Sequence, residues 1–161
     1  MFDLEEMALG AGAALKEKKQ TVAVAESSSG GLICAALLAV PGASSYFKGG
    51  GVVYTSQAKT LLVEVSAEAM AADRAATETH ALLLARAARA RLGADWGIGE
   101  TGAAGPTGNR YGDAAGHSCI GIAGPREQSL TITTHSDERA ANMQAFAKAA
   151  IELLCTCVEQ S

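Results

Sequence analysis

Thr21-Val-Ala-Val-Ala-Glu-Ser-Ser-Ser-Gly-Gly31 sets the architecture of this chain. Residues 21–25 are apolar without alternation, which predicts a strand buried on both faces. A carboxylate, three hydroxyls and two glycines follow, and residues 30–39 then show a helical pattern that stops at Pro41-Gly42. A strand, a tight turn and a helix N-terminus therefore meet in one place. Such a junction offers backbone N–H groups and the positive end of a helix dipole to an anion or a developing oxyanion.

The flanking sequence predicts further strands and helices. Helices are expected over residues 3–19, 56–63, 66–70 and 77–92 and from Ser136 or Asp137 to about Cys155, and strands over 49–54, 95–100, 117–123 and 128–135. Gly124-Pro125 is a tight connection, so the last two strands should form an antiparallel hairpin. Early alternation of strand and helix followed by a hairpin predicts an α/β fold, with helices on both faces of a mixed sheet. A length of 161 residues fits a single domain over residues 1–161.

Composition and charge argue against several classes of protein. The net charge is -4 and the basic residues are scattered, whereas affinity for nucleic acid needs a basic face. No apolar run is long enough to span a bilayer, and residues 1–15 lack the basic start of a signal peptide. The four cysteines form no Cys-x-x-Cys pair, so we expect no metal site and a reducing cytoplasm; they are Cys34, Cys119, Cys155 and Cys157.

The three consecutive serines, Ser27 to Ser29, have two interpretations. They form an N-cap cluster, or one of them is a nucleophile. The histidines show no Ser-His-Asp spacing, and the Gly-x-Ser-x-Gly elbow is absent. A lysine with a lowered pKa can activate a serine instead, and Lys59 is the candidate. If strands 21–25 and 49–54 are parallel neighbours, Ser27 and Tyr54 leave the sheet at one edge and Lys59 reaches back to them; the alternative is a lysine on a helix surface.

A glycine-rich segment over residues 101–116 is the second candidate binding element. Gly102, Gly105 and Gly108 allow a close backbone approach that suits a phosphate, although no Gly-Lys-[Ser/Thr] follows as in a P-loop. A flexible loop is the alternative interpretation. Arg110 and Arg139 are candidate partners for an anion, or solvated surface charges.

Three segments together resemble the CinA C-terminal domain family. Ala25-Glu-Ser-Ser-Ser-Gly-Gly31 is similar to the Ala-Glu-Ser-Cys-Thr-Gly-Gly signature of that family. The stretch from Pro41 to Lys59 looks like its Pro-Gly-Ser-Ser and Tyr-Ser-Asn-Glu-Ala-Lys blocks. Thr101-Gly-Ala-Ala-Gly-Pro106 is similar to its Thr-Gly-Ile-Ala-Gly-Pro loop. The similarity runs in one register from about residue 4 to residue 155.

The resemblance implies an amidohydrolase that deamidates nicotinamide mononucleotide, a pyridine nucleotide, to the carboxylate and ammonia. It implies a three-layer α/β/α sandwich with a mixed, mostly parallel sheet of about five strands. A homo-oligomer without metal or other cofactor is also implied. The nucleophile maps to Ser27 and the supporting pair to Tyr54 and Lys59. Substrate contacts map to the serine turn, the glycine loop and two arginines, namely Ser29, Gly30, Gly31, Thr101, Gly102, Gly105, Arg110 and Arg139. The N–H groups near Gly30 and Gly31 would hold the oxyanion.

The segment after Pro106 departs from the family pattern. The family commonly has Gly-Gly and then Lys-Pro-Val-Gly, where this chain has Asp113-Ala-Ala-Gly116. A positive charge becomes negative beside the expected substrate, and Arg110 is placed to compensate for it. Two hypotheses remain: hydrolysis of nicotinamide mononucleotide or a related amide, and a non-catalytic module that binds or senses a nucleotide.

Overall fold

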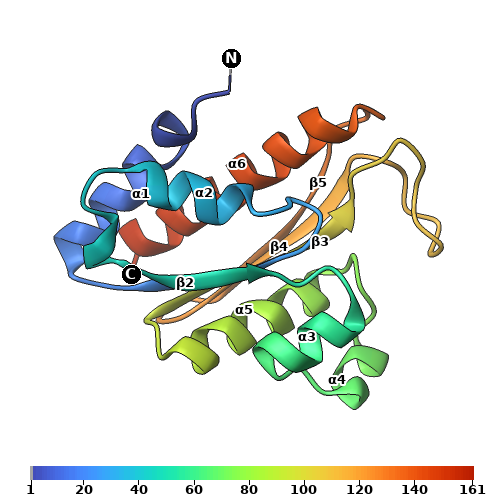
Figure 1. Ribbon diagram of the computed structural model, residues 1–161, viewed down its shortest axis with the longest axis horizontal. Coiled ribbons are helices and arrows are strands. Elements are labelled where there is room, and N and C mark those ends of the chain that lie inside the picture. Colours follow the sequence, from blue (N-terminus) through green and yellow to red (C-terminus); the bar gives the residue numbers. More distant parts are fainter. Residues whose placement is uncertain (1) are drawn as a thin grey trace.

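The computed structural model describes residues 2–161, which form a five-stranded sheet between two layers of helices (Figure 1). The elements along the chain are α1 (Leu4–Lys18), β1 (Val22–Glu26), α2 (Leu32–Ala39), the 3-10 turn η1 (Ala43–Ser45), β2 (Phe47–Val52), α3 (Ser56–Val63), α4 (Ala67–Ala72), α5 (Glu78–Leu92), β3 (Trp96–Ala103), β4 (His117–Ala123), β5 (Gln128–Thr133) and α6 (Arg139–Glu159). Helices α1, α2 and α6 cover one face of the sheet, and α3, α4 and α5 cover the other (Figure 1).

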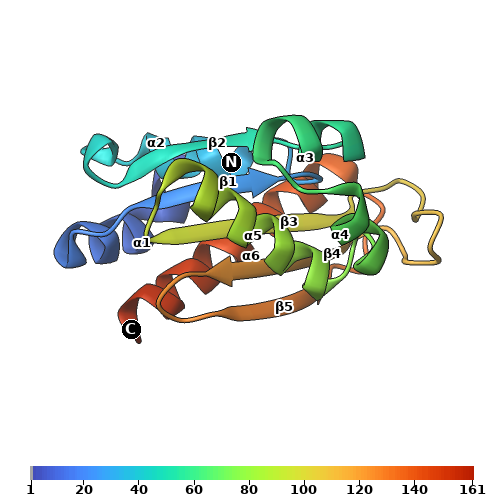
Figure 2. The same cartoon turned by 90° about the horizontal axis from the view of Figure 1, so that it is seen from below.

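The strand order is β2-β1-β3-β4-β5 (Figure 2). β1 pairs in parallel with β2 and β3, whereas β3 with β4 and β4 with β5 are antiparallel pairs. Four of the five strands therefore run in the same direction, with β4 reversed. These pairings confirm the α/β sandwich, its mixed sheet and the late hairpin. They also confirm that β1 and β2 are parallel neighbours, so both strands end at the same edge of the sheet.

The two faces of the sheet carry side chains of different size. Toward α1, α2 and α6 the strands present large apolar residues, including Val22, Trp96 and Ile120. Toward α5 they present Ala23, Ala25 and a floor of glycines, which we call the glycine floor and which consists of Gly97, Gly99 and Gly121. A Cβ atom on Gly99 would lie 1.9 Å from the Ala81 carbonyl oxygen. Helix α5 therefore packs directly on the backbone of β3 and β4.

Some element bounds differ from the expected ones because neighbouring strands override local pattern. β3 extends to Ala103, since its last residues pair with the start of β4, including Thr101 with Cys119 and Gly102 with Ser118. Thr101 and Gly102 are thus strand residues, and the expected loop begins after them. β2 ends at Val52, which leaves Tyr54 in the connection to α3. Helix α6 begins at Arg139, later than the predicted cap.

None of the helices within residues 2–161 combines the length and the hydrophobicity that a membrane span requires.

Candidate active site

The serine turn that follows β1 is held by the carboxylate of Glu100, a buried residue of β3. Glu100 accepts hydrogen bonds from the backbone N–H groups of Ser27 at 3.0 Å and Ser29 at 2.9 Å. It also accepts from the hydroxyl of Ser28 and, at 2.7 Å, from that of Ser118. A buried carboxylate needs such partners, and these donors fix the turn in one conformation.

A second buried carboxylate, that of Glu26, occupies the N-terminus of α2. It accepts hydrogen bonds from the N–H groups of Gly31 at 2.9 Å, Ile33 at 3.1 Å and Cys34 at 2.9 Å. The N-cap residue of α2 is Gly31, which has no side chain that could accept these hydrogen bonds. A negative charge at this end of a helix is favourable, and Glu26 takes the place of both a capping serine and an external anion.

The N–H groups expected to hold the oxyanion have partners inside the protein. The Gly31 N–H is bonded to Glu26, and the Gly30 N–H donates to the Ser27 carbonyl at 3.1 Å. Ser29, expected to contact substrate, is completely buried, and its hydroxyl lies 2.6 Å from Glu26 and 2.9 Å from Glu100. All three groups are engaged inside the protein, so none is available to a substrate in this conformation.

Ser27 differs from the two serines that follow it. Its hydroxyl has no hydrogen-bond partner within residues 2–161, whereas those of Ser28 and Ser29 are bonded to glutamates. The backbone N–H of Ser28 also lacks a partner among the described residues. A free hydroxyl and a free N–H thus lie on adjacent residues. In acyl-transfer enzymes, the N–H that follows the nucleophile commonly contributes to the oxyanion hole.

Lys59 is a buried residue of α3, not the surface lysine of the alternative interpretation, and it contacts a histidine. Its side chain is 4% exposed, and Nζ lies 2.9 Å from Nε2 of His80 on α5. The Nδ1 atom of His80 lies 2.7 Å from the carbonyl oxygen of Asp73. Burial lowers the pKa of the Lys59 ammonium, and the charge of Glu100 acts in the opposite direction. No hydrogen bond joins Lys59 to Ser27 among the described residues.

Tyr54 lies at the same sheet edge with its side chain pointing to the surface. The N–H of Val53 donates to the Glu26 carbonyl at 2.8 Å, which places the backbone of Tyr54 beside the serine turn. The tyrosine is 59% exposed, and within residues 2–161 its hydroxyl bonds to neither Ser27 nor Lys59. The structure therefore brings the backbone of Tyr54 to the candidate site without engaging its hydroxyl.

The glycine loop is anchored to the start of α6. Arg139 donates to the Gly105 carbonyl, and buried Asn142 donates to the Ala104 carbonyl at 2.8 Å. Gly105 has a φ of 105°, a conformation that favours glycine. The N–H groups at positions 104, 105, 107 and 108 have no partner among the described residues. Of the remaining predicted contacts, Thr101 is buried and its hydroxyl accepts a hydrogen bond from the Ala76 N–H at 3.0 Å.

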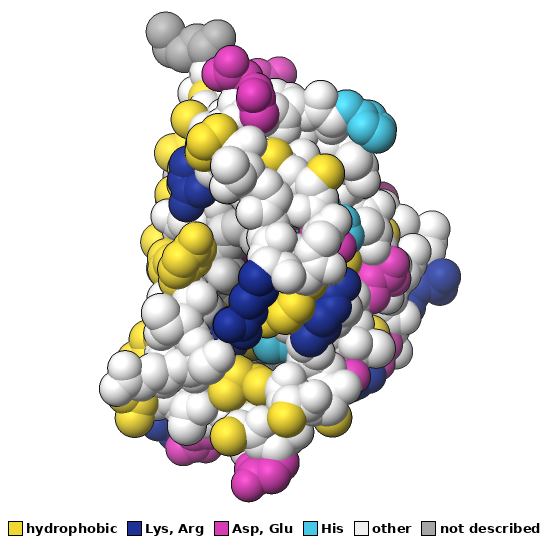
Figure 3. All heavy atoms as spheres, turned by 90° about the vertical axis from the view of Figure 1, so that its right-hand side faces the viewer, with side chains coloured by type: hydrophobic (Ala, Val, Ile, Leu, Met, Phe, Trp, Pro, Cys, Tyr) yellow, Lys and Arg dark blue, Asp and Glu magenta, His cyan; other side chains and the backbone are white. Residues whose placement is uncertain are grey.

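The tip of this loop is an ordered cluster around Tyr111. Arg74 and Arg110 lie over the Tyr111 ring at 4.7 and 5.0 Å from its centroid, and Arg110 also donates to its hydroxyl. Figure 3 views this end of the molecule and shows basic side chains next to hydrophobic ones. Asp113 forms an ion pair with Arg74 at 3.1 Å and accepts from Asn109. The negative charge expected to face substrate is thus neutralised within the cluster, and Arg110 is directed to Tyr111.

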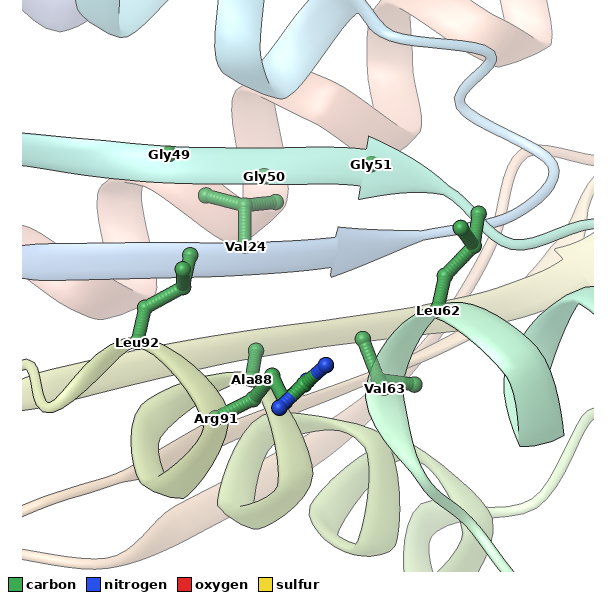
Figure 4. Close-up of a pocket in the computed structure, with 9 residues that line it drawn as sticks. All are labelled: Val24, Gly49, Gly50, Gly51, Leu62, Val63, Ala88, Arg91 and Leu92. Carbon is green, nitrogen blue, oxygen red and sulfur yellow. The ribbon is translucent and has the colours of Figure 1, made fainter.

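An apolar hollow lies away from the serine turn. It is a cavity of about 440 Å³ between β2 and the helices α3 and α5 (Figure 4). Its walls include the backbone of Gly49 to Gly51 and the side chains of Leu62 and Leu92. Arg91 at its rim forms an ion pair with Glu64 at 3.3 Å. None of the predicted site residues lines this cavity. Within residues 2–161, no three His, Cys, Asp or Glu side chains converge as metal ligands.

Three residues of the site, Glu26, Glu100 and His80, were missed by sequence reasoning. Glu100 interrupts the strand Trp96-Gly-Ile-Gly-Glu100, and Glu26 ends a fully apolar strand. Charged residues are almost never fully buried without partners, so a glutamate within a buried strand is a usable signal. His80 carried no such signal, since its contact with Lys59 depends on how α3 packs against α5.

The family model of the CinA C-terminal domain matches residues 4–158. The chain belongs to this family. A CinA-like protein from Synechocystis sp. is 39% identical over 137 residues, which cover 85% of this chain and 33% of that protein. One from Desulfosudis oleivorans is 39% identical over 144 residues, which cover 89% of this chain and 35% of that protein. The chain thus spans about a third of the length of these curated relatives.

Solved structures agree with the family assignment. The competence/damage inducible protein CihA from Agrobacterium tumefaciens matches with a TM-score of 0.86 and 27% identity over 98% of each chain. A CinA superfamily protein from Klebsiella pneumoniae has a TM-score of 0.91 at 23% identity over 99% of each chain, a likeness that concerns the fold alone. The α/β/α fold of this CinA domain is therefore shared with known structures.

Proposed function

We propose that this CinA domain hydrolyses a carboxamide, with nicotinamide mononucleotide as the first candidate substrate and Ser27 as the nucleophile. The observation that carries the proposal is the contrast among the three serines. Only Ser27, within the serine turn, keeps a hydroxyl that no described residue engages, and it stands next to the free N–H of Ser28. A nucleophile and an oxyanion donor are the two groups that amide hydrolysis needs.

The proposed reaction begins when Ser27 Oγ attacks the carboxamide carbon. The Ser28 N–H stabilises the oxyanion, a contribution typically worth about 3 kcal/mol. The neutral amine of Lys59 accepts the serine proton and returns it to the leaving nitrogen, which departs as ammonia. Water then hydrolyses the acyl-enzyme and releases the carboxylate. β1 ends at Glu26, and side-chain alternation continued one residue further would direct position 27 to the face of Ala23 and Ala25, the face covered by the helices that carry Lys59 and His80.

The glycine loop is the proposed site for the substrate phosphate. Its unpartnered N–H groups at positions 105, 107 and 108 and the guanidinium of Arg139 are suited to an anion. Tyr54 is free to close over the bound substrate from the end of β2. Thr101 and Gly102 support the loop from within β3.

The test is ammonia release from nicotinamide mononucleotide, nicotinamide riboside and nicotinamide. We expect Ser27→Ala to abolish release while Ser28→Ala, a matched control, retains most of it. Release that survives Ser27→Ala and disappears in Ser28→Ala would contradict the assignment. A phosphate contribution from the loop predicts a lower KM for the mononucleotide than for the riboside.

A binding module without turnover is the second candidate function. The observation that favours it is the absence of a hydrogen bond between Ser27 and Lys59 within the described residues. Calorimetry discriminates the two functions, because a binding module would bind nicotinamide mononucleotide without releasing ammonia. Catalytic contacts are often long before substrate binds, which is why we place hydrolysis first.

We further propose that the domain forms a homo-oligomer through the β2 edge. Large apolar side chains are exposed on β2 and α3, among them Val52 at 45%, Leu61 at 67% and Leu62 at 56%. Exposed apolar patches commonly mark contact surfaces. Light scattering should give a mass of more than one chain, and Leu61→Glu should reduce it. Leu9→Glu should leave the mass unchanged, because Leu9 is 48% exposed but belongs to α1, which lies on the other face of the sheet from α3 (Figure 1).

A further inference from the structure

We propose that His80 is a positioning residue for Lys59: its Nε2 atom holds the lysine amine in place and restricts the pair to a single positive charge. The catalytic part of this inference rests on the proposed amide hydrolysis. The structural part concerns the protonation of Lys59 Nζ and His80 Nε2 and does not depend on the proposed hydrolysis.

The geometry fixes which nitrogen of His80 carries the proton. Nδ1 lies 2.7 Å from the Asp73 carbonyl, which can only accept, so Nδ1 is the donor. A neutral His80 therefore has its lone pair on Nε2, 2.9 Å from Nζ of Lys59. Lys59 must donate to that lone pair. The contact with Asp73 thus determines the tautomer of the histidine, and the contact with Lys59 determines the direction of the lysine side chain.

The same contact limits the charge of the pair. If Lys59 were an ammonium and His80 an imidazolium, two N–H groups would point at each other across 2.9 Å. Both residues are buried, with exposures of 4% and 1%, so water does not relieve this repulsion. The pair therefore titrates as a unit that holds one positive charge at most.

The charged neighbours of the pair are few. Glu100 on β3 acts on Lys59, and Asp73, before α5, acts on His80 through its carbonyl and its carboxylate. Burial lowers the pKa of His80, and the charge of Lys59 lowers it further, against the Asp73 contributions. These directions agree with a neutral histidine that serves as a permanent acceptor near neutral pH.

The consequence for catalysis is a defined route for one proton. The pair begins uncharged, Lys59 takes the proton that leaves Ser27, and the new ammonium donates to His80 Nε2. The proton then returns to the departing nitrogen, so the pair ends uncharged. His80 never contacts substrate in this scheme; it orients the amine before the transfer and stabilises the ammonium after it.

Nuclear magnetic resonance on the full chain tests the proton count without turnover. The chain has six lysines and three histidines, so isotope-labelled side chains give few signals, assigned with Lys59→Arg and His80→Gln. We expect His80 to show the Nδ1–H tautomer and Lys59 to titrate once. An Nε2–H tautomer, or simultaneous charge on both residues, would overturn the proposal.

Two isosteres of the histidine test its role as acceptor. Glutamine at position 80 offers an oxygen near the place of Nε2, whereas asparagine reaches only the Asp73 carbonyl. We expect His80→Gln to retain the Lys59 titration and His80→Asn to lower the Lys59 pKa, since a buried ammonium loses its acceptor. If the domain releases ammonia, kcat should fall about tenfold in His80→Asn at unchanged KM and within about threefold in His80→Gln.

Equal losses in the two variants, or no loss in His80→Asn, would contradict the inference, with circular dichroism confirming that both variants fold. The two arms separate the inference from the proposed function. Absence of ammonia release from every amide would defeat the hydrolysis but leave the resonance result to decide the proton count. Ammonia release with the wrong tautomer would defeat the inference alone.

Discussion

Two buried carboxylates give three identical neighbouring residues different chemistry. The hydroxyl of Ser28 is bonded to Glu100, and the hydroxyl of Ser29 lies between Glu26 and Glu100. Ser27 contributes only its N–H to Glu100, so its oxygen stays free to react. In the proposed reaction, the nucleophile is therefore selected by the partners that the turn supplies, not by the type of residue.

Removal of the Glu100 carboxylate should be costly because several buried donors share it. We expect Glu100→Ala to lower the free energy of unfolding by about 3 to 5 kcal/mol, as for other broken buried charge networks. Urea denaturation measures this. Glu78→Ala is the matched control, since Glu78 accepts from Ser129 and Thr131 at the edge of the sheet. A loss at position 100 no larger than at position 78 would contradict the network.

His80 should make folding sensitive to acid. Its pKa is lowered from 6.5 in the folded chain, so below pH 6.5 the unfolded chain binds the proton first and stability falls until the folded pKa is reached. The slope is at most about 1.4 kcal/mol per pH unit. His80→Gln lacks this slope, so the stability difference between wild type and variant should shrink from pH 7 to pH 5. A constant difference in urea denaturation would show that His80 protonates equally in both states.

At the scale of elements, the main device is a strand that caps the following helix. Glu26 ends β1 and turns its carboxylate onto the N–H groups of α2. The strand, the serine turn and the helix are thus joined by one side chain. Because these N–H groups of α2 are bonded inside the protein, the oxyanion donor that we propose is the Ser28 N–H.

Glu26→Gln should weaken this junction by about 2 kcal/mol, because it removes the charge at the helix N-terminus and places an NH₂ group where an acceptor is needed. Thermal or urea unfolding gives the value. Asp3→Asn is the control, since Asp3 caps α1 through one exposed hydrogen bond of 3.0 Å to Glu6. Losses of equal size would argue that Glu26 acts as an ordinary cap.

Elements with their own pattern could be predicted from the sequence, and contacts between elements could not. The strand predicted over 117–123 and the helix predicted over 77–92 follow from local signals, and the structure has them over 117–123 and 78–92. The end of β3 depends on pairing with β4, so local pattern stopped it too early. In the candidate site, Ser27 and Lys59 could be proposed from the sequence segments that resemble those of the family. The contact of Lys59 with His80 and the Glu100 network depend on packing across the sheet and between helices.

At the scale of the whole molecule, the glycine floor allows helix α5 to pack closely against the sheet. Gly99→Ala would place a Cβ 1.9 Å from the Ala81 carbonyl, and α5 would have to lift. We expect a loss of about 3 kcal/mol or more in urea denaturation, at the upper end of the cost of overpacking. Gly51→Ala is the control, because a Cβ there meets nothing within 4 Å. A tolerated alanine at position 99 would mean that α5 has room to move.

The glycine floor also sets the distance between α5 and the sheet, and with it the position of His80. Helix α5 carries His80 one residue before Ala81, whose carbonyl rests on Gly99. The height of the helix above the sheet therefore fixes how far the imidazole stands from the lysine amine. A methyl group added beneath the helix would lengthen the hydrogen bond between Lys59 and His80 without altering a single polar atom. In the proposed reaction, glycines of the sheet that never approach the substrate would thus influence the position of the base.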